Sequence, residues 1–189
     1  MGSNRSILLQ KDEISEIANE TGFTSKQIQR LYSRFTSLDK NNTGYLSKQD
    51  FERIPELHIN PLKDRIIEVL IDDNGHDEKI NFRQFAKVFS TFRRGKSGQN
   101  DSNSKENKLK FLFGIYDRDK DEKINKTELL GILRMLVGSN IPEEQMNAIA
   151  ERTIAELDVD GDLSITFEEF VQTLEKIDID EKMSMKFLT

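Results

Sequence analysis

The chain has 189 residues, a formal net charge of −6 at pH 7, 33% charged residues and no cysteine, and its isoelectric point is near 5.1. This acidic balance argues against a protein that binds nucleic acid, which normally presents a basic face. The lack of cysteine excludes disulfides, cysteine zinc sites and thiol catalysis. No apolar run approaches the ~20 residues of a membrane span, and the run 7–9 is too short for a secretory signal. We expect a soluble, intracellular protein.

The first six residues, Met-Gly-Ser-Asn-Arg-Ser, fit the pattern for N-myristoylation at Gly2. The alternative is an ordinary flexible terminus. One myristoyl chain gives only marginal membrane affinity, about 10⁴ M⁻¹, so lasting attachment would need a partner embedded in the membrane. We assign residues 1–22 to a myristoylated N-terminal arm followed by a short helix.

Residues 23–92 are predicted to form a first pair of helix–loop–helix units. An amphipathic helix over 25–38 leads into the loop 39–50, whose spacing of oxygen-bearing residues is that of a calcium-binding EF-hand loop. Position 12 of this loop, where a glutamate normally gives two oxygens, is Asp50. Because the aspartate side chain is shorter, we expect this loop to be empty or weakly occupied.

The second loop, 73–84, has Gly75 and Gln84 at ligand positions, so we interpret it as a scaffold loop without a divalent ion. Residues 93–107 are poor in apolar side chains and are predicted to be a flexible linker.

Two stretches of the second half carry the full ligand spacing of a calcium site, 117–128 and 158–169. Side-chain ligands at positions 1, 3, 5 and 12 are Asp117, Asp119, Asp121 and Glu128 in one loop, and Asp158, Asp160, Asp162 and Glu169 in the other. Asn125 and Thr166 stand at position 9, and the backbone carbonyls of Lys123 and Ser164 serve at position 7. We predict one Ca²⁺ ion in each loop, two in all.

Position 6 of these two loops normally needs glycine for a sharp turn, yet it is Glu122 in one and Leu163 in the other. A positive φ at either residue costs on the order of 1 kcal/mol. We expect some loss of calcium affinity but not its abolition, because all the ligands are present.

The exit helices carry more apolar side chains than their own units need to bury. Core packing is one interpretation; the other is a groove for an amphipathic partner helix, opened when calcium holds the helices apart. The predicted groove residues are Phe85, Phe89, Leu129, Leu133, Leu136, Met146, Ile149 and Phe170. Whether calcium acts as a switch or as a permanent structural ion is left open by the sequence.

Four loops that begin at Asp39, Asp73, Asp117 and Asp158 predict an all-α fold of two EF-hand pairs, that is four helix–loop–helix units, with short β-strands paired between loops. Ile124 and Ile165, at position 8, are expected to face each other in one such pair. Residues 108–176 form the calcium-binding pair, and 177–189 form a C-terminal tail that covers or borders the groove.

The sequence around the loops resembles calcineurin B homologous protein. The matching segments are Leu-Tyr-Ser-Arg-Phe-Thr-Ser-Leu-Asp-Lys (31–40), Arg-Ile-Pro-Glu-Leu (53–57), Asn-Pro-Leu (60–62), Asp-Lys-Asp-Glu-Lys-Ile (119–124), Leu-Arg-Met-Leu-Val-Gly (133–138), Asp-Gly-Asp (160–162) and Glu-Lys-Met-Ser (181–184). The resemblance implies a myristoylated cytoplasmic protein at the plasma membrane or endomembranes, which also shuttles to the nucleus. It further implies a regulatory subunit that clasps the juxtamembrane helix in the cytoplasmic tail of a Na⁺/H⁺ exchanger, and that inhibits calcineurin.

Calcineurin B is similar too, and implies a regulatory protein that associates with the catalytic subunit of a phosphatase. That family keeps glutamate at position 12 of all four loops, whereas here the first two loops end in Asp50 and Gln84; this difference favours the homologous protein. A myristoylated calcium sensor or buffer is a further alternative. An enzyme is disfavoured because His58 and His76 have no nucleophile or metal partner in sequence, so we predict a non-catalytic protein.

Overall fold

The computed structural model describes residues 9–72, 78–93 and 103–183 of the chain. The predictions at Gly2, at residues 73–77 of the second loop, at 94–102 of the linker and at 184–189 of the tail lie outside this part. Within the described residues, no helix combines the length and apolar character needed to cross a bilayer.

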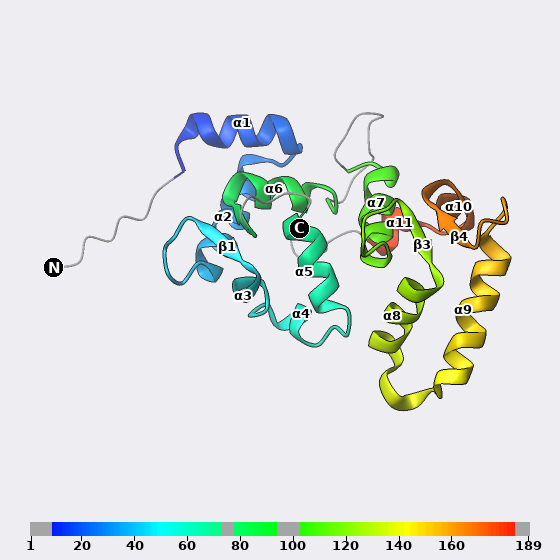
Figure 1. Ribbon diagram of the computed structural model, residues 1–189. Coiled ribbons are helices and arrows are strands. Elements are labelled where there is room, and N and C mark those ends of the chain that lie inside the picture. Colours follow the sequence, from blue (N-terminus) through cyan, green and yellow to red (C-terminus); the bar gives the residue numbers. More distant parts are fainter. Residues whose placement is uncertain (1–8, 73–77, 94–102, 184–189) are drawn as a thin grey trace.

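The first half contains two helix–loop–helix units preceded by an extra helix (Figure 1). Its elements are α1 (Lys11–Thr21), α2 (Ser25–Leu38), β1 (Tyr45–Ser47), α3 (Lys48–Phe51), α4 (Pro55–His58), α5 (Lys63–Asp72), β2 (Lys79–Asn81) and α6 (Phe82–Ser90). Helix α1 packs against α2 and α6. The predicted N-terminal helix is therefore part of the first core.

The second half repeats the plan and lies beside the first (Figure 1). Its elements are α7 (Lys105–Tyr116), β3 (Lys123–Asn125), α8 (Lys126–Val137), the 3₁₀ helix η1 (Gly138–Asn140), α9 (Glu143–Leu157), β4 (Ser164–Thr166), α10 (Phe167–Thr173) and α11 (Ile179–Lys182). Helix α7 starts within the segment predicted as linker, and α11, from the predicted tail, packs against α7.

The two loops of each half are joined by a short antiparallel ladder. Leu46 of β1 lies opposite Ile80 of β2, and Ile124 of β3 lies opposite Ile165 of β4. All four side chains are at most 2% exposed, so the position-8 residues tie the loops together from inside each core. The predicted all-α fold with strands paired between loops is confirmed.

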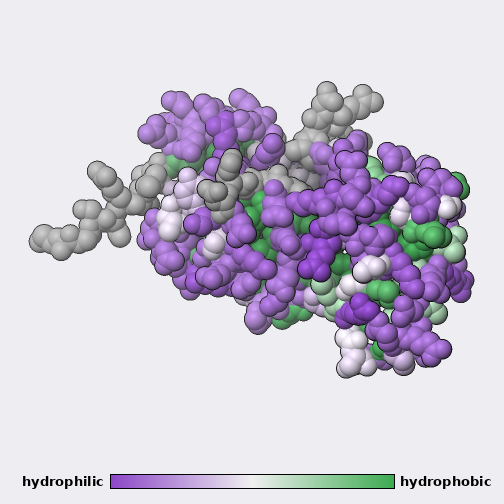
Figure 2. All heavy atoms as spheres, viewed as in Figure 1, coloured by the Kyte–Doolittle hydropathy of each residue, from purple (hydrophilic) through white to green (hydrophobic). Residues whose placement is uncertain are grey.

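Each half has its own apolar core, and a smaller cluster joins them. Val69 of α5, Ile115 of α7 and Ile132 of α8 are buried together at the junction. Outside these cores the face in Figure 2 is mostly hydrophilic, with hydrophobic side chains visible in smaller patches between the polar ones. The junction places helix α5 of the first half directly against the helix that enters the third loop.

Candidate calcium loops and partner groove

The third loop, 117–128, folds around its own acidic side chains. The two carboxylate oxygens of Asp117 accept hydrogen bonds from loop amides at 2.8 and 3.1 Å. Asp119 and Asp121 each accept from the amide two residues further on, at 3.3 and 2.9 Å. One carboxylate oxygen from each of Asp117, Asp119 and Glu128 lies within 4.8 Å of the others. These oxygens are the hard ligands that Ca²⁺ prefers, so the cluster of three suits this ion. Asp121 is not part of the cluster, and its role as a ligand stays a prediction.

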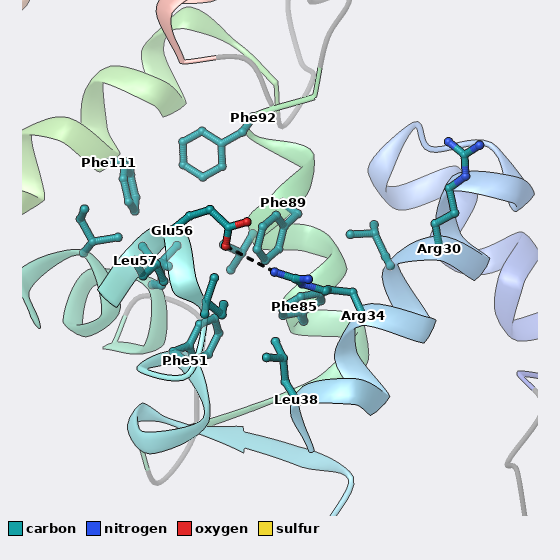
Figure 3. Close-up of a pocket in the computed structure, with 15 residues that line it drawn as sticks. Arg30, Arg34, Leu38, Phe51, Glu56, Leu57, Phe85, Phe89, Phe92 and Phe111 are labelled. Carbon is teal, nitrogen blue, oxygen red and sulfur yellow. Dashed lines mark ion pairs between the residues drawn. The ribbon is translucent and has the colours of Figure 1, made fainter. Parts of the chain in front are cut away.

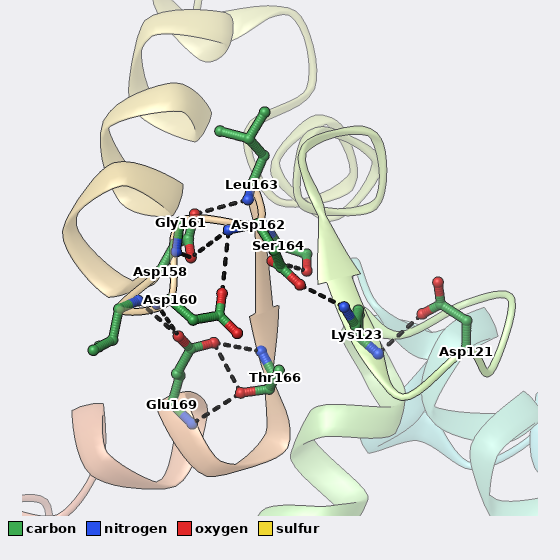
Figure 4. Close-up of polar contacts among 11 residues, drawn as sticks. Asp121, Lys123, Asp158, Asp160, Gly161, Asp162, Leu163, Ser164, Thr166 and Glu169 are labelled. Atoms are coloured by element: carbon green, nitrogen blue, oxygen red, sulfur yellow. Dashed lines mark hydrogen bonds and ion pairs between the residues drawn. The ribbon is translucent and has the colours of Figure 1, made fainter.

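The fourth loop, 158–169, repeats this arrangement (Figure 4). Asp158 accepts from loop amides at 2.7, 3.2 and 2.8 Å, and Asp162 accepts from the amide and hydroxyl of Ser164 at 2.9 and 2.5 Å. Carboxylate oxygens of Asp158, Asp160 and Asp162 lie within 4.8 Å of one another. This loop therefore also offers a cluster of hard oxygens suited to Ca²⁺.

The glutamate at position 12 connects the start of each loop with its exit helix. One oxygen of Glu169 accepts from the amides of Val159 and Asp160 at 2.6 and 3.4 Å, while the other accepts from Thr166, the N-cap of α10, at 2.8 Å. Glu128 does the same in the third loop, with the amides of Arg118 and Asp119 at 2.7 and 3.2 Å. The glutamate at position 12 is thus both a predicted calcium ligand and the N3 residue of the capping box of its exit helix.

The first loop lacks this connection. Both Asp50 and its hydroxyl partner Ser47 belong to the capping box of α3, and the remaining Asp50 oxygen pairs with Arg53 at 3.0 Å. Among the described residues of this loop, no hydrogen bond joins Asp50 to the amides at positions 2 and 3, in contrast to the two glutamates. The shorter side chain stays at the helix. That this loop is empty or weakly occupied stays a prediction.

In the second loop, position 12 is Gln84, whose side chain ends in a neutral carboxamide. Gln84 accepts from the Asn81 amide at 2.8 Å and caps α6, so its side chain is used for helix capping.

The turn at position 6 has the strained backbone that the sequence predicts. The φ angles of Glu122 and Leu163 are 67° and 69°, in the left-handed region, and Gly44 of the first loop has 78° at the same position. Leu163 is 75% exposed, so its side chain gains almost no burial energy to offset this strain.

The pKa values of the acidic residues are shifted in opposite directions in the two loops. Burial raises the pKa of Asp117, with nearby Glu128 and Asp121 charges adding to the effect. In the fourth loop, the ammonium of Lys123 and the hydroxyl of Ser164 lower the pKa of Asp162 to about 2. Backbone amides of Thr166 and Val159 lower the pKa of Glu169.

An apolar groove of about 610 Å³ opens in the first half. Figure 3 shows aromatic rings from several helices around it, and an ion pair between Arg34 of α2 and Glu56 of α4 that joins its two sides at 3.6 Å. The full lining is Arg30, Leu31, Arg34, Leu38, Phe51, Ile54, Glu56, Leu57, Ile66, Leu70, Phe85, Val88, Phe89, Phe92 and Phe111. Phe111 belongs to α7, so one wall of the groove comes from the second half.

Two of the eight predicted groove residues, Phe85 and Phe89, line this groove. The other six are in the second half: Leu129 and Met146 are buried in its core, Leu133 and Phe170 pack against that core, and Leu136 and Ile149 are 47% and 42% exposed. For those six, a role in partner binding stays a prediction. Phe111, an apolar residue of α7, was not predicted to line a groove.

Comparison with known proteins agrees with this geometry. Residues 106–183 match the family model of an EF-hand domain pair. The calcineurin B subunit of Naegleria gruberi is 42% identical, over 98% of this chain and 99% of that protein. The calcineurin B subunit of Candida glabrata is 38% identical over 92% and 94%, and the type 1 calcineurin B subunit of Dictyostelium discoideum is 36% identical over 99% of both chains.

The fold and loops therefore define a calcium-binding EF-hand protein. More closely, the chain belongs to the calcineurin B family. Its relatives carry the name of calcineurin B itself, so they support that alternative better than calcineurin B homologous protein, which the first two loops favoured. The prediction of a non-catalytic regulatory protein is confirmed.

Proposed function

We propose that this chain is a calcineurin B-type regulatory subunit that binds an amphipathic helix of a phosphatase catalytic subunit in its apolar groove. The observation that carries the proposal is the groove itself, because its Phe51, Phe85, Phe89, Phe92 and Phe111 rings gather around one opening. Relatives named for calcineurin B cover nearly the whole chain, which supports a partner of the same class.

The groove suits a helix better than a small metabolite. Its lining is almost entirely aliphatic and aromatic, and its charged residues, including Arg34 and Glu56, are at the rim. An amphipathic helix lays one apolar stripe into such a groove and keeps its polar face in water. Burial of that stripe would contribute roughly 25 cal/mol per Å² of apolar surface removed from water, less the cost of ordering the helix.

We further propose that the two loops of the second half each hold one Ca²⁺ ion. The ligand residues are Asp117, Asp119, Asp121, Lys123 (carbonyl) and Glu128 in one loop and Asp158, Asp160, Asp162, Ser164 (carbonyl) and Glu169 in the other. The ion would supply a positive charge that relieves the repulsion among four carboxylates in each loop. The chain's own part is to fix the loop to its exit helix, through the hydrogen bonds of Glu128 and Glu169 described above.

Removing both position-12 carboxylates tests this assignment. The double variant Glu128→Gln with Glu169→Gln is expected to lose high-affinity calcium binding in calorimetry, since each amide supplies one neutral oxygen in place of a bidentate anion. Glu168→Gln, next to Glu169 in the chain, is the matched control and should bind two ions. Two tight sites in the double variant would refute the assignment.

Partner binding is tested with two fluorescent peptides. One is the calcineurin catalytic-subunit helix to which the regulatory protein binds; the other is the juxtamembrane helix of a Na⁺/H⁺ exchanger. The full chain is titrated into each, with calcium and with chelator, and Phe89→Asp is the variant that disrupts the groove. We expect tighter binding to the phosphatase helix and its loss in Phe89→Asp. Binding to neither peptide would overturn the proposed function.

A specific observation keeps the exchanger as a second candidate. Asp50 and Gln84 leave the first two loops without the position-12 glutamate that calcineurin B has, and this was the feature that resembled calcineurin B homologous protein. In that case myristoylated Gly2 and the exchanger would hold the protein at the plasma membrane or endomembranes. Preference for the exchanger peptide would establish this alternative. Calcium binding with no helix partner at all would indicate a sensor or buffer.

A further inference from the structure

A buried arginine from the first half holds the end of the helix that enters the third calcium loop. Arg65 of α5 is only 5% exposed. Its guanidinium donates to the carbonyls of Gly114, Ile115 and Asp117 at 2.7, 3.1 and 3.2 Å, and its remaining nitrogen pairs with Glu68 at 2.6 Å. Few side chains could make these contacts, because they need a rigid cation with donors in several directions.

The acceptors are groups that a helix end leaves without an intrahelical partner. The last carbonyls of a helix carry partial negative charge and are stabilised by a cation. Asp117 is both the C-cap of α7 and the first residue of the loop 117–128. Arg65 therefore contacts the backbone at the point where calcium ligands begin.

Further contacts make this junction rigid. Gly114 of α7 lies next to Val69 of α5: a Cβ built on this glycine would be in van der Waals contact, 3.4 Å from a Val69 methyl group. Lys120, at position 4 of the loop, pairs with Asp72 at the end of α5 at 3.2 Å. The loop is thus joined to α5 on both sides of its first ligand.

The same two helices form part of the partner groove. Ile66 follows Arg65 on α5, and Phe111 lies three residues before Gly114 on α7; both line the groove. The Phe111 ring packs edge-on against Phe92, with centroids 4.9 Å apart. A shift of α7 relative to α5 would therefore move one aromatic wall of the groove.

We infer that Arg65 is a positioning residue that couples the third calcium loop to the affinity of the groove for a helix. The inference rests on the proposed function and concerns its regulation. With calcium held by 117–128, the start of the loop would be fixed. Arg65 would then transmit that position to α5 and keep Phe111 where the partner helix needs it. Because coupling of binding free energies is reciprocal, a helix in the groove must tighten calcium binding by the same factor.

The test measures the ratio of two dissociation constants for the same peptide, the one in chelator divided by the one in saturating calcium. The dissociation constant of the phosphatase-helix peptide is determined with the full chain in chelator and in saturating calcium, for wild type, Arg65→Met, Arg65→Lys and Asp72→Asn. Arg152→Met is the control, because Arg152 is exposed and pairs with Glu156 of its own helix, α9. Such ratios are typically about 5- to 150-fold.

We expect the ratio to fall close to one in Arg65→Met, to fall partly in Arg65→Lys and Asp72→Asn, and to stay at the wild-type value in Arg152→Met. Asp72→Asn changes an exposed pair, so it should fold even if Arg65→Met does not. If Arg65 only stabilises the fold, its variants would have a lower melting temperature but the wild-type ratio. The wild-type ratio in every folded variant would therefore overturn the inference. A wild-type ratio of one overturns it too, while leaving the proposed function in place; binding of neither peptide in wild type instead removes the proposed function.

Discussion

Lys123 of the third loop forms an ion pair with Asp162 of the fourth (Figure 4). Its backbone carbonyl stands at a ligand position of its own loop, while its ammonium reaches an acidic side chain at a ligand position of the neighbouring loop. The pair also raises the pKa of Lys123. The two loops are thus connected by charge as well as by the β3–β4 ladder. We expect this lysine to compete with a cation bound in the fourth loop.

Lys123→Met should therefore strengthen calcium binding at the fourth loop. The substitution keeps the backbone carbonyl and the aliphatic stem, but it removes a positive charge that an incoming ion must displace or tolerate. We expect an affinity gain of about 1.5-fold to fivefold, in line with the ~0.2–1 kcal/mol of partly exposed ion pairs. Competition against a chelator dye measures it. Lys126→Met, which loses a pair with Glu151 away from the loops, is the control; weaker calcium binding in Lys123→Met would contradict the argument.

Asp50→Glu should strengthen calcium binding at the first loop, which we expect to be empty or weakly occupied in the wild type. The extra methylene lets a carboxylate oxygen approach the amides at positions 2 and 3, as Glu128 and Glu169 do in their loops. With only Asp39 as a second carboxylate, we expect weak affinity, about 10⁻⁴ to 10⁻³ M. Calorimetry should then show a third ion. Gln84→Glu in the second loop is the comparison. An unchanged number of bound ions in Asp50→Glu would show that the length of the position-12 side chain does not limit calcium binding in the first loop.

Leu163→Gly should stabilise the calcium-free protein. The leucine has a φ of 69° and is 75% exposed, so glycine relieves the strain and removes little buried surface. We expect a gain of about 1 kcal/mol in the free energy of unfolding, which corresponds to roughly 2–4 °C in melting temperature for a domain of this size. Chemical denaturation in chelator provides the measurement. Leu163→Ala keeps the strained backbone and should not gain; equal stabilisation by alanine would assign the effect to the side chain instead.

Local signals made the loops predictable from sequence. Ligand spacing located 117–128 and 158–169, and the place of Ile124 and Ile165 at position 8 of these loops located the strand pair. Both signals depend on residues close in the chain. The strained turns at Glu122 and Leu163 were predictable in the same way, since the position-6 turn has a known backbone requirement.

The groove was less predictable because it depends on how the halves pack. Phe111 is one of several apolar residues of α7, and nothing in its local sequence indicates whether it packs in its own half or across the junction. Phe111 packs against the first core, and Ile115 lies at the junction. Arg65 gave no signal at all, since its carbonyl acceptors lie about 50 residues away in sequence.

The two calcium loops should respond differently to acid. Asp117 has a raised pKa because of burial, whereas Asp162 and Glu169 have lowered pKa values because of the Lys123 ion pair and loop amides. Without calcium, the contribution of Asp117 to stability is present below the ordinary aspartate pKa and is lost as pH rises through its raised value. The contribution of Glu169 is present above the ordinary glutamate pKa and is lost as pH falls through its lowered value.

On acidification, protons therefore compete with calcium at Asp117 before they compete at Asp162 or Glu169. Glu169→Gln leaves only the third loop able to bind tightly, and Glu128→Gln leaves only the fourth, so each loop can be titrated alone. We expect Glu169→Gln to begin losing calcium at a higher pH than Glu128→Gln, starting above the ordinary aspartate pKa of 3.8. Calcium affinity measured by calorimetry at stepped pH provides the comparison. The opposite order, or coincident curves, would mean that burial of Asp117 does not control proton competition once the ion is bound.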